Sequence, residues 1–310
     1  MTAATRSYEV ADIARQLGVS PTDLPAQICE LIRTSHLEHR PIEGRERDAL
    51  ILRVIRELEK PLEVAGEHRL PRWEMGWGEN LDAFIASGYD FAALVPKFVR
   101  PGEPVRIQGE YIQPISTGFD VDYIRILVTW LYARYFDQTS EIHEFGCGTS
   151  QNLIPAAQLY PGRPLFGYDW AKPSQGIIDL LAEHRGINIK GQVFDMFRPD
   201  PSVKLAPGAG VITIGSLEQL GTKIDPFLDF LIERRPAVVA NMDSFNELYD
   251  PEHLPDALAL RYDRKRGYLE GWVSKLRALE AKGVIEFLDQ RRGYGNIFHE
   301  GHGYVVWRVV

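Results

Sequence analysis

The first 120 residues carry mostly helical patterns of apolar positions. Val10, Ile13, Ala14 and Leu17 recur at the spacing of one helix face, and Gly18 directly after them is a typical helix end. Similar spacing predicts helices over residues 22–33, 45–59 and 122–136. Between residues 72 and 114, aromatic side chains mix with glycine and proline. This texture predicts a loop-rich lid with a short strand over 105–112.

From Glu141 onward the pattern alternates between short apolar strands and amphipathic helices, which is typical of a parallel α/β sheet. The predicted strands are 141–145, 164–168, 188–194, 211–214 and 237–241, and the predicted helices are 151–159, 174–185, 224–234 and 255–282. Two final strands, 284–288 and 304–309, are close enough to form an antiparallel hairpin. We therefore expect a mostly helical region over 1–120 and an α/β region over 121–310.

Composition and charge narrow the class of protein. The chain has 310 residues, of which 45% are hydrophobic and 25% charged, as in ordinary globular proteins. Its formal net charge of −8 disfavours nucleic acid as a partner, because proteins that neutralise phosphates usually carry the opposite sign. No apolar run approaches the roughly 18–20 residues of a membrane helix, so no membrane partner is expected. Only two cysteines, Cys29 and Cys147, favour a cytoplasmic location.

The histidines do not suggest a metal site. His143 lies inside a predicted strand, and His299 with His302 forms a loose pair without thiolate or carboxylate ligands at metal-binding spacing. We therefore expect no metal.

The sharpest local pattern is a strand that runs into Gly146-Cys147-Gly148, with a helix opening a few residues later. Glycines at such a turn let the backbone bend tightly and approach a ligand without interference from a Cβ atom. The start of the helix offers free N–H groups to a polar or anionic group of the ligand. The turn is therefore a candidate binding loop.

With Glu144 two residues before the first glycine, this segment resembles the first motif of the class I S-adenosylmethionine-dependent methyltransferases, acid-x-Gly-x-Gly. The third glycine common in that motif is replaced here by Ser150. A dinucleotide-binding fingerprint would have glycine at position 151, where this chain has Gln151. The resemblance covers roughly residues 120–310. It implies a Rossmann-like seven-stranded sheet, S-adenosylmethionine as cofactor, and a cofactor loop made of Glu144, Gly146 and Gly148.

The resemblance assigns further roles to acids after the next two strands. Asp169 ends the second strand, where a carboxylate can accept hydrogen bonds from both ribose hydroxyls. Asp195 ends the third strand, where the family usually binds the adenine amino group. Trp170 and Met196 are candidates to pack against the adenine. Acids at strand ends also cap helices, so it is their succession after three strands that favours a cofactor site.

Candidate catalytic residues follow the fourth and fifth strands, where the family places groups that face the reaction: Ser216, Glu218 and Asn241, together with Asp243. From the lid side, Tyr111 and Tyr123 are candidates to contact the sulfonium through cation–π attraction, worth about 0.5–2 kcal/mol. The expected reaction is methyl transfer to a small molecule. Whether the chain is a monomer or a homodimer stays open.

Three other functions remain open. A methyltransferase-like enzyme can attack the aminobutyryl chain of its own cofactor, as azetidine-2-carboxylate synthases do, releasing methylthioadenosine. A binding protein without catalysis would use the N-terminal helices, although intact acids at three strand ends argue against it. A nicotinamide oxidoreductase is disfavoured by Gln151 and Asp195.

Overall fold

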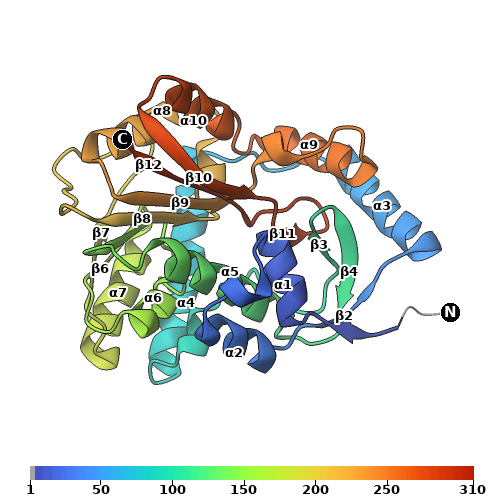
Figure 1. The fold of residues 1–310 in the computed structure, drawn as a ribbon, viewed down its shortest axis with the longest axis horizontal. Coiled ribbons are helices and arrows are strands. Elements are labelled where there is room, and N and C mark those ends of the chain that lie inside the picture. The colour runs from blue at the N-terminus through green and yellow to red at the C-terminus, as the bar shows by residue number, and fades with distance from the viewer. Residues whose placement is uncertain (1–3) are drawn as a thin grey trace.

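The computed structural model describes residues 4–310, and its central element is a seven-stranded sheet with the order β10-β12-β9-β8-β5-β6-β7 (Figure 1). Strand β12 runs antiparallel to both neighbours, and the other neighbouring strands are parallel. The bounds are β5 Ile142–Phe145, β6 Leu165–Asp169, β7 Ile189–Val193, β8 Gly210–Ile214, β9 Val238–Asp243, β10 Ile285–Arg291 and β12 Gly303–Val309. The seven-stranded, Rossmann-like sheet expected for a class I methyltransferase fold is confirmed.

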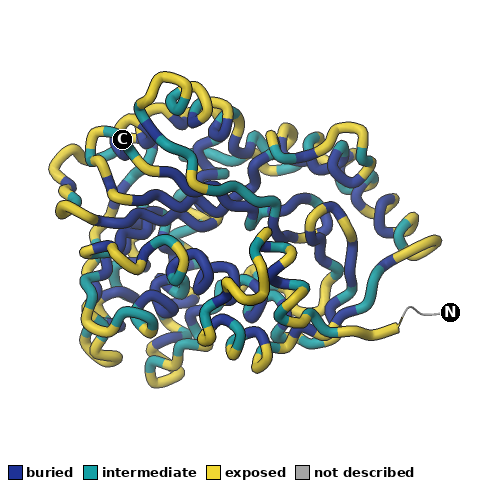
Figure 2. Tube along the Cα trace, in the orientation of Figure 1, coloured by how far each residue is buried: buried dark blue, intermediate teal, exposed yellow. Residues whose placement is uncertain are grey.

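Alternate side chains of the sheet point to two separate hydrophobic cores. One face packs on helices that include α5 (Phe119–Tyr135), α6 (Leu153–Leu159) and α7 (Lys172–Arg185). The opposite face packs on α8 (Asp225–Arg234) and α10 (Trp272–Ala281). Because both faces are covered, β5, β8 and β9 are buried along their whole length. Figure 2 shows them within a buried band flanked by exposed outer helices.

The N-terminal region contributes helices and a second, antiparallel sheet with the order β1-β2-β4-β3-β11. Its helices are α1 Val10–Leu17, α2 Ala26–Thr34, α3 Gly44–Glu59 and α4 Leu70–Ala86. Its strands are β1 Arg6–Ser7, β2 Glu38–Pro41, β3 Val105–Ile107, β4 Glu110–Pro114 and β11 Tyr294–Asn296. Strand β11 comes from the connection between β10 and β12, so the C-terminal part of the chain completes the N-terminal sheet.

Most predicted elements are present, with two corrections. Residues 72–114 are not mainly loop, because α4 occupies much of the first half and packs against α7, while β3 and β4 form a hairpin. The predicted helix over 255–282 is two helices, α9 (Leu254–Arg266) and α10, because Gly267 ends the first in a left-handed conformation. Short 3₁₀ helices fill several connections: η1 Pro21–Asp23, η2 Glu67–Arg69, η3 Phe91–Leu94, η4 Leu217–Leu220 and η5 Asn246–Leu248.

Candidate functional site

A cavity opens at the carboxyl ends of β5, β6 and β8. This is the point where successive strands lie on opposite sides of β5, and open α/β sheets bind their ligands at such switch points. The cavity holds about 490 Å³ of space between protein atoms, part of it open to solvent. Its lining comprises Trp73, Trp77, Gly146, Asp169, Trp170, Phe194, Met196, Phe197, Gly215, Ser216, Gln219 and Leu220.

The floor of the cavity is the glycine loop after β5. Gly146 has φ +75°, and a Cβ atom there would overlap the side chain of Ser216. Gly148 has φ +53°, and its Cβ would lie 2.8 Å from the ring of Trp77. Both positions therefore require glycine for conformation and for space. Ser150, which replaces the third glycine of the motif, adopts φ +59°, so the loop keeps a glycine-like backbone at that position.

Asp169, at the end of β6, brings a carboxylate to the cavity. Its Oδ2 accepts the N–H of Gly148 at 2.8 Å and its Oδ1 accepts the N–H of Ala171 at 2.8 Å. Burial raises the pKa of Asp169 to about 6, although these two N–H donors oppose the shift. Since each carboxylate oxygen has more than one lone pair, both can still accept a hydrogen bond from a ligand.

Glu144 lies in β5 beneath the loop and does not line the cavity. The side chain is fully buried, with Oε1 accepting the amide N–H of Asn152 at 3.1 Å and Oε2 without a partner. Burial raises the pKa of Glu144 to about 8, Asn152 opposes this, and the nearby charge of Asp169 raises it further. An unpartnered buried carboxylate oxygen is costly in an empty site and becomes useful if a cationic or N–H group approaches.

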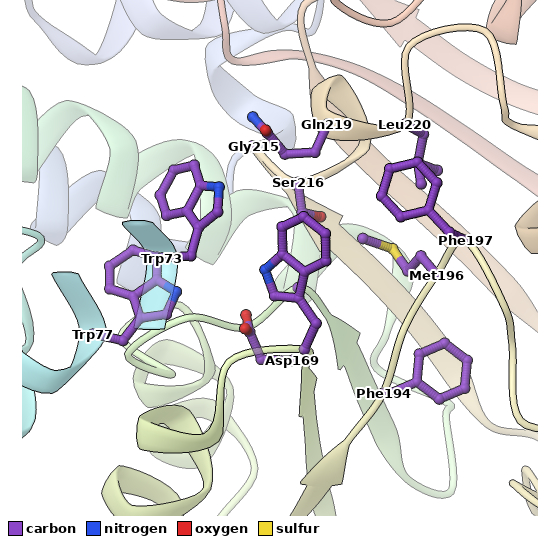
Figure 3. Close-up of a pocket in the computed structure, with 12 residues that line it drawn as sticks. Trp73, Trp77, Asp169, Phe194, Met196, Phe197, Gly215, Ser216, Gln219 and Leu220 are labelled. Atoms are coloured by element: carbon purple, nitrogen blue, oxygen red, sulfur yellow. The ribbon is translucent and has the colours of Figure 1, made fainter. Parts of the chain in front are cut away.

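Two groups of apolar side chains form the walls. Figure 3 shows Trp73 and Trp77 on one side and Met196, Phe197 and Leu220 on the other. Trp73 and Trp77, from α4, stack with ring centroids 5.4 Å apart. The sequence prediction placed both tryptophans only in a general lid, because their helix was missed. Their spacing of four residues is the signal that would have placed them on one helix face.

On the opposite wall, Trp170 stacks with Phe197 at 5.9 Å, so the predicted adenine-packing positions Trp170 and Met196 do line the cavity. Asp195 does not line it. The carboxylate of Asp195 accepts the N–H of Phe197 at 2.9 Å and pairs with Arg198 at 2.8 Å. In this structure it therefore supports the wall rather than facing the cavity.

Of the predicted catalytic residues, only Ser216 lines the cavity, and its hydroxyl donates to the carbonyl of Phe145 at 3.0 Å. Glu218, two residues further on in η4, accepts the side-chain amide N–H of Gln219 at 2.9 Å. The buried carboxylate of Asp243 accepts the N–H groups of Leu217 and Glu218, at 2.8 and 3.3 Å, and so holds η4 in place.

The structure does not bring Asn241, a predicted catalytic residue, to the cavity. Its side chain is fully buried between strands, away from the cavity. Its Oδ1 accepts the indole N–H groups of Trp272 and Trp307, and its Nδ2 donates to Thr213. These bonds occupy the amide, which serves as a polar anchor for two buried tryptophans.

Tyr111 and Tyr123, the predicted substrate contacts, do not line the cavity either. Tyr111 is buried against α3 and α9 residues, with its hydroxyl donating to the carbonyl of Ile297 at 3.2 Å. Tyr123 is buried on α5, stacks on Phe119, and bonds to the Gln16 side chain at 2.5 Å. The aromatic residues that the structure brings to the site from the N-terminal region are Trp73 and Trp77 of α4.

Within residues 4–310, the His, Cys, Asp and Glu side chains form no group of three or more arranged to hold a metal ion. None of the helices in the same part of the chain combines the length and apolar character needed to cross a bilayer.

No protein-family model and no curated protein sequence matches the chain. Among solved structures, it is similar to a SAM-dependent methyltransferase from Anabaena variabilis, at 15% identity over 81% of this chain and 99% of that chain, with a TM-score of 0.46. The CcbJ methyltransferase from Streptomyces caelestis is 13% identical over 59% of this chain and 88% of that chain, with a TM-score of 0.41. The branched-chain polyamine synthase from Thermus thermophilus is 12% identical over 75% of this chain and 64% of that chain, with a TM-score of 0.43. These similarities are too distant to indicate an activity for this chain.

Proposed function

We propose that the chain is an S-adenosylmethionine-dependent methyltransferase that acts on a small molecule. The observation that carries this proposal is the cavity at the sheet switch point, which combines a glycine floor after β5 with the Asp169 carboxylate at the end of the neighbouring strand. The cavity is lined mainly by apolar and aromatic side chains with a small number of polar groups, as ligand pockets usually are.

The residues present fit the cofactor in polarity and in the flat surfaces that they offer. Asp169 offers free lone pairs to the ribose hydroxyls, and the flat surfaces of Trp170 and Phe197 suit an adenine ring. At the other end, the loop of Gly146 and Gly148 allows close approach to the backbone. When bound there, S-adenosylmethionine would supply an activated methyl group.

The chain's own contribution is orientation and exclusion of water. Trp73 and Trp77 stand over the glycine loop and, with Phe98, form an aromatic cluster at the lid. An aromatic surface beside the sulfonium stabilises positive charge by cation–π attraction, the role first predicted for Tyr111 and Tyr123. A dry, shaped site aligns an acceptor with the methyl carbon, and alignment is most of what this reaction requires.

The test is calorimetric titration of S-adenosylhomocysteine into wild type and Asp169→Asn. We expect the variant to bind about 10- to 100-fold more weakly, because a hydrogen bond to a charged group contributes about 1.5–3 kcal/mol. Asp179→Asn is the matched control, since Asp179 is exposed on α7 and distant from the cavity lining. Asp195→Asn should cost less than Asp169→Asn. Tight binding of NADH by a wild type that ignores S-adenosylhomocysteine would overturn the proposal.

A further inference from the structure

A polar cluster, made of Arg69, Glu218, Asp263, Arg266 and His299, adjoins the cavity. Its members come from four separate parts of the fold: η2, η4, α9 and the connection between β11 and β12. The cluster touches the cavity through Arg69, whose guanidinium donates to the side-chain oxygen of Gln219 at 2.9 Å and lies 5.3 Å from the ring centre of Trp73. Both Gln219 and Trp73 line the cavity.

The cluster contains two buried guanidinium nitrogens without hydrogen-bond partners, Arg69 Nε and Arg266 Nε, with the unpartnered Trp73 Nε1 beside them. Arg69, Asp263 and His299 are at least 94% buried. An unpartnered buried polar group costs about 1–3 kcal/mol, so such a concentration calls for an explanation. A polar ligand that enters from the cavity would supply the missing partners.

Arg266 takes part in none of the ion pairs within the described part of the chain, although the Glu218 carboxylate lies within electrostatic reach of it. Its guanidinium packs 4.8 Å from the ring centre of Tyr268 and reaches the hydroxyl of Tyr262 at 3.5 Å. A half-buried guanidinium packed beside two aromatic rings is well arranged to bind a carboxylate.

His299 and Asp263 form a carboxylate–imidazole pair. Nδ1 of His299 lies 2.9 Å from Oδ1 of Asp263, within ion-pair distance but not aligned as a hydrogen bond. The other oxygen of Asp263 accepts the hydroxyl of Ser244 at 2.9 Å. The pair thus holds the ring from the Nδ1 side and leaves Nε2 to act on a ligand.

The charges around His299 come from several elements. Burial disfavours the charged ring, but Asp263 of α9 and Glu218 of η4 hold the pKa of His299 above its ordinary value, while Arg106 of β3 opposes them. Tyr262 and Tyr268 pack against the ring, and His302 lies within electrostatic reach. Burial raises the pKa of Glu218 as well, and His299, Arg266 and Arg69 lower it in part.

Space for a second small molecule is available. A second, open cavity is bounded by residues 65–68, residues 219–223 and Gly267, and shares Phe197, Gln219 and Leu220 with the first. It holds about 750 Å³ of space between protein atoms, part of it open to solvent. It runs past residues directly adjacent in sequence to Arg69 and Arg266. A molecule beside the cofactor therefore has room at the border of the polar cluster.

We propose that the polar cluster is the acceptor site and that the acceptor is a small hydroxylated carboxylic acid, with Arg266 binding its carboxylate and His299 accepting its hydroxyl proton. This inference rests on the function proposed above. The proton goes to Nε2 of His299 and the oxygen keeps the electron pair of its O–H bond. That oxygen forms the new bond to the methyl carbon, while the carbon–sulfur bond of the donor breaks and leaves its electron pair on sulfur. Asp263 is a positioning residue that stabilises the charged ring.

The probe for this inference is 4-hydroxybenzoate, titrated into the full-length protein saturated with S-adenosylhomocysteine. Phenols ionise near pH 10, so the free probe is neutral at its hydroxyl at pH 7.5. Binding beside His299 should produce the ultraviolet absorption of the phenolate. Benzoate should bind without that change, and phenol, which lacks the carboxylate, should bind more weakly.

The variants separate the two roles. Arg266→Gln should weaken binding of 4-hydroxybenzoate about 10- to 100-fold, as expected for loss of a charged hydrogen bond. His299→Gln should still bind the probe but leave it as the phenol. Arg261→Gln, exposed on the same helix, is the matched control and should behave as wild type. Melting temperatures establish that each variant is folded.

The possible failures are distinguishable. If wild type does not bind S-adenosylhomocysteine, the proposed function fails. If it binds S-adenosylhomocysteine but not 4-hydroxybenzoate, the acceptor class assigned here is wrong. Unchanged binding in Arg266→Gln, or phenolate absorption that persists in His299→Gln, overturns the role given to that residue.

Discussion

Ser150 shows how a single position can depart from a motif and still preserve its geometry. It adopts φ +59° and is fully buried, with a hydroxyl that has no hydrogen-bond partner. A left-handed conformation costs a residue other than glycine roughly 1–2 kcal/mol. The serine therefore carries a strain that the glycine of the family motif avoids.

We expect Ser150→Gly to relieve this strain, partly offset by the roughly 0.5–1 kcal/mol that glycine loses in chain entropy. The free energy of unfolding should change by less than about 1 kcal/mol. Ser150→Val should lose about 1–3 kcal/mol, because a β-branched residue tolerates this conformation poorly. Urea denaturation of both variants measures the difference. A valine variant as stable as wild type would contradict the assigned backbone.

Glu144 gives a pH dependence whose sign follows from its environment. Burial raises its pKa from 4.5 to about 8 in the folded protein. Between these values the unfolded chain has lost the proton and the folded chain retains it, so folding takes up a proton. The contribution of Glu144 to stability is therefore greatest below pH 4.5 and falls as the pH rises through 8.

Glu144→Gln removes that titration while keeping the shape of the side chain. The free energy of unfolding of the variant minus that of wild type, measured at pH 5, 6, 7 and 8, should increase steadily with pH. Burial also raises the pKa values of Asp169, Glu218 and Asp243. Because these residues are present in both proteins, their contributions largely cancel when the two unfolding free energies are subtracted. A difference that does not vary with pH would rule out the raised pKa.

At this scale, sequence reasoning reached some site residues and missed others for a physical reason. Gly146 and Asp169 could be predicted from the sequence because the end of a strand and the residues of a turn are local properties. Asn241 is not brought to the cavity, because its amide bonds to Trp272 and Trp307, which lie 31 and 66 residues further along the chain. No local pattern shows where such a side chain points.

Among the elements, α4 was missed and most strands of the large sheet were found. Trp73, Gly76, Trp77 and Gly78 have modest or poor helix propensity, so the segment reads as loop. In the structure α4 packs against α7, and this tertiary contact outweighs the propensity. The strands were predictable because they are short apolar runs between turns, a signal that burial on both faces strengthens.

The segment after η3 is the part of the lid most suited to respond to ligand. Phe98 is 63% exposed, yet its ring lies about 6 Å from those of Trp73 and Trp77. Lys97 is also exposed, so the Lys97–Phe98 bond is accessible to trypsin. The bond after Arg100 is a poor tryptic site because Pro101 follows it. A cofactor that orders the two tryptophans should order this segment too.

We therefore expect S-adenosylhomocysteine to slow tryptic cleavage of the Lys97–Phe98 bond. Mass spectrometry of the fragments over time measures the rate. Cleavage at an exposed site remote from the cavity, such as Lys282, is the internal control and should be unaffected. Equal rates at Lys97 with and without ligand would mean that the segment is a fixed platform rather than a lid.

The whole molecule does not divide cleanly at residue 120. Strand β11, from the C-terminal part of the chain, completes the N-terminal sheet by pairing with β3. One hydrophobic core includes side chains from Ile13 to Val306. The predicted regions 1–120 and 121–310 therefore share a sheet and a hydrophobic core. Long-range pairing of this kind leaves no signature in local periodicity, which is why the sequence could not reveal it.

This joined architecture places the cavity between α4 and the carboxyl edge of the large sheet. The remaining question is which carbon of the cofactor is attacked there. Incubation of the protein with S-adenosylmethionine alone distinguishes the alternatives. Attack on the methyl carbon needs a separate acceptor and leaves S-adenosylhomocysteine, so the proposed function predicts almost no turnover. Attack within the aminobutyryl chain needs no second substrate and leaves methylthioadenosine.

We expect no acceptor-free turnover, because a polar cluster with unpartnered atoms beside the cavity is suited to a second molecule rather than to cyclisation of the first. Mass spectrometry of the nucleosides, with a heat-denatured sample to measure spontaneous breakdown, is the measurement. Methylthioadenosine formed above that background, and reduced in Ser216→Ala, would overturn methyl transfer while leaving the cofactor site in place. In that case the cluster would have to act on the aminobutyryl carboxylate, a group that Arg266 could equally bind, and Arg266→Gln should then slow methylthioadenosine release.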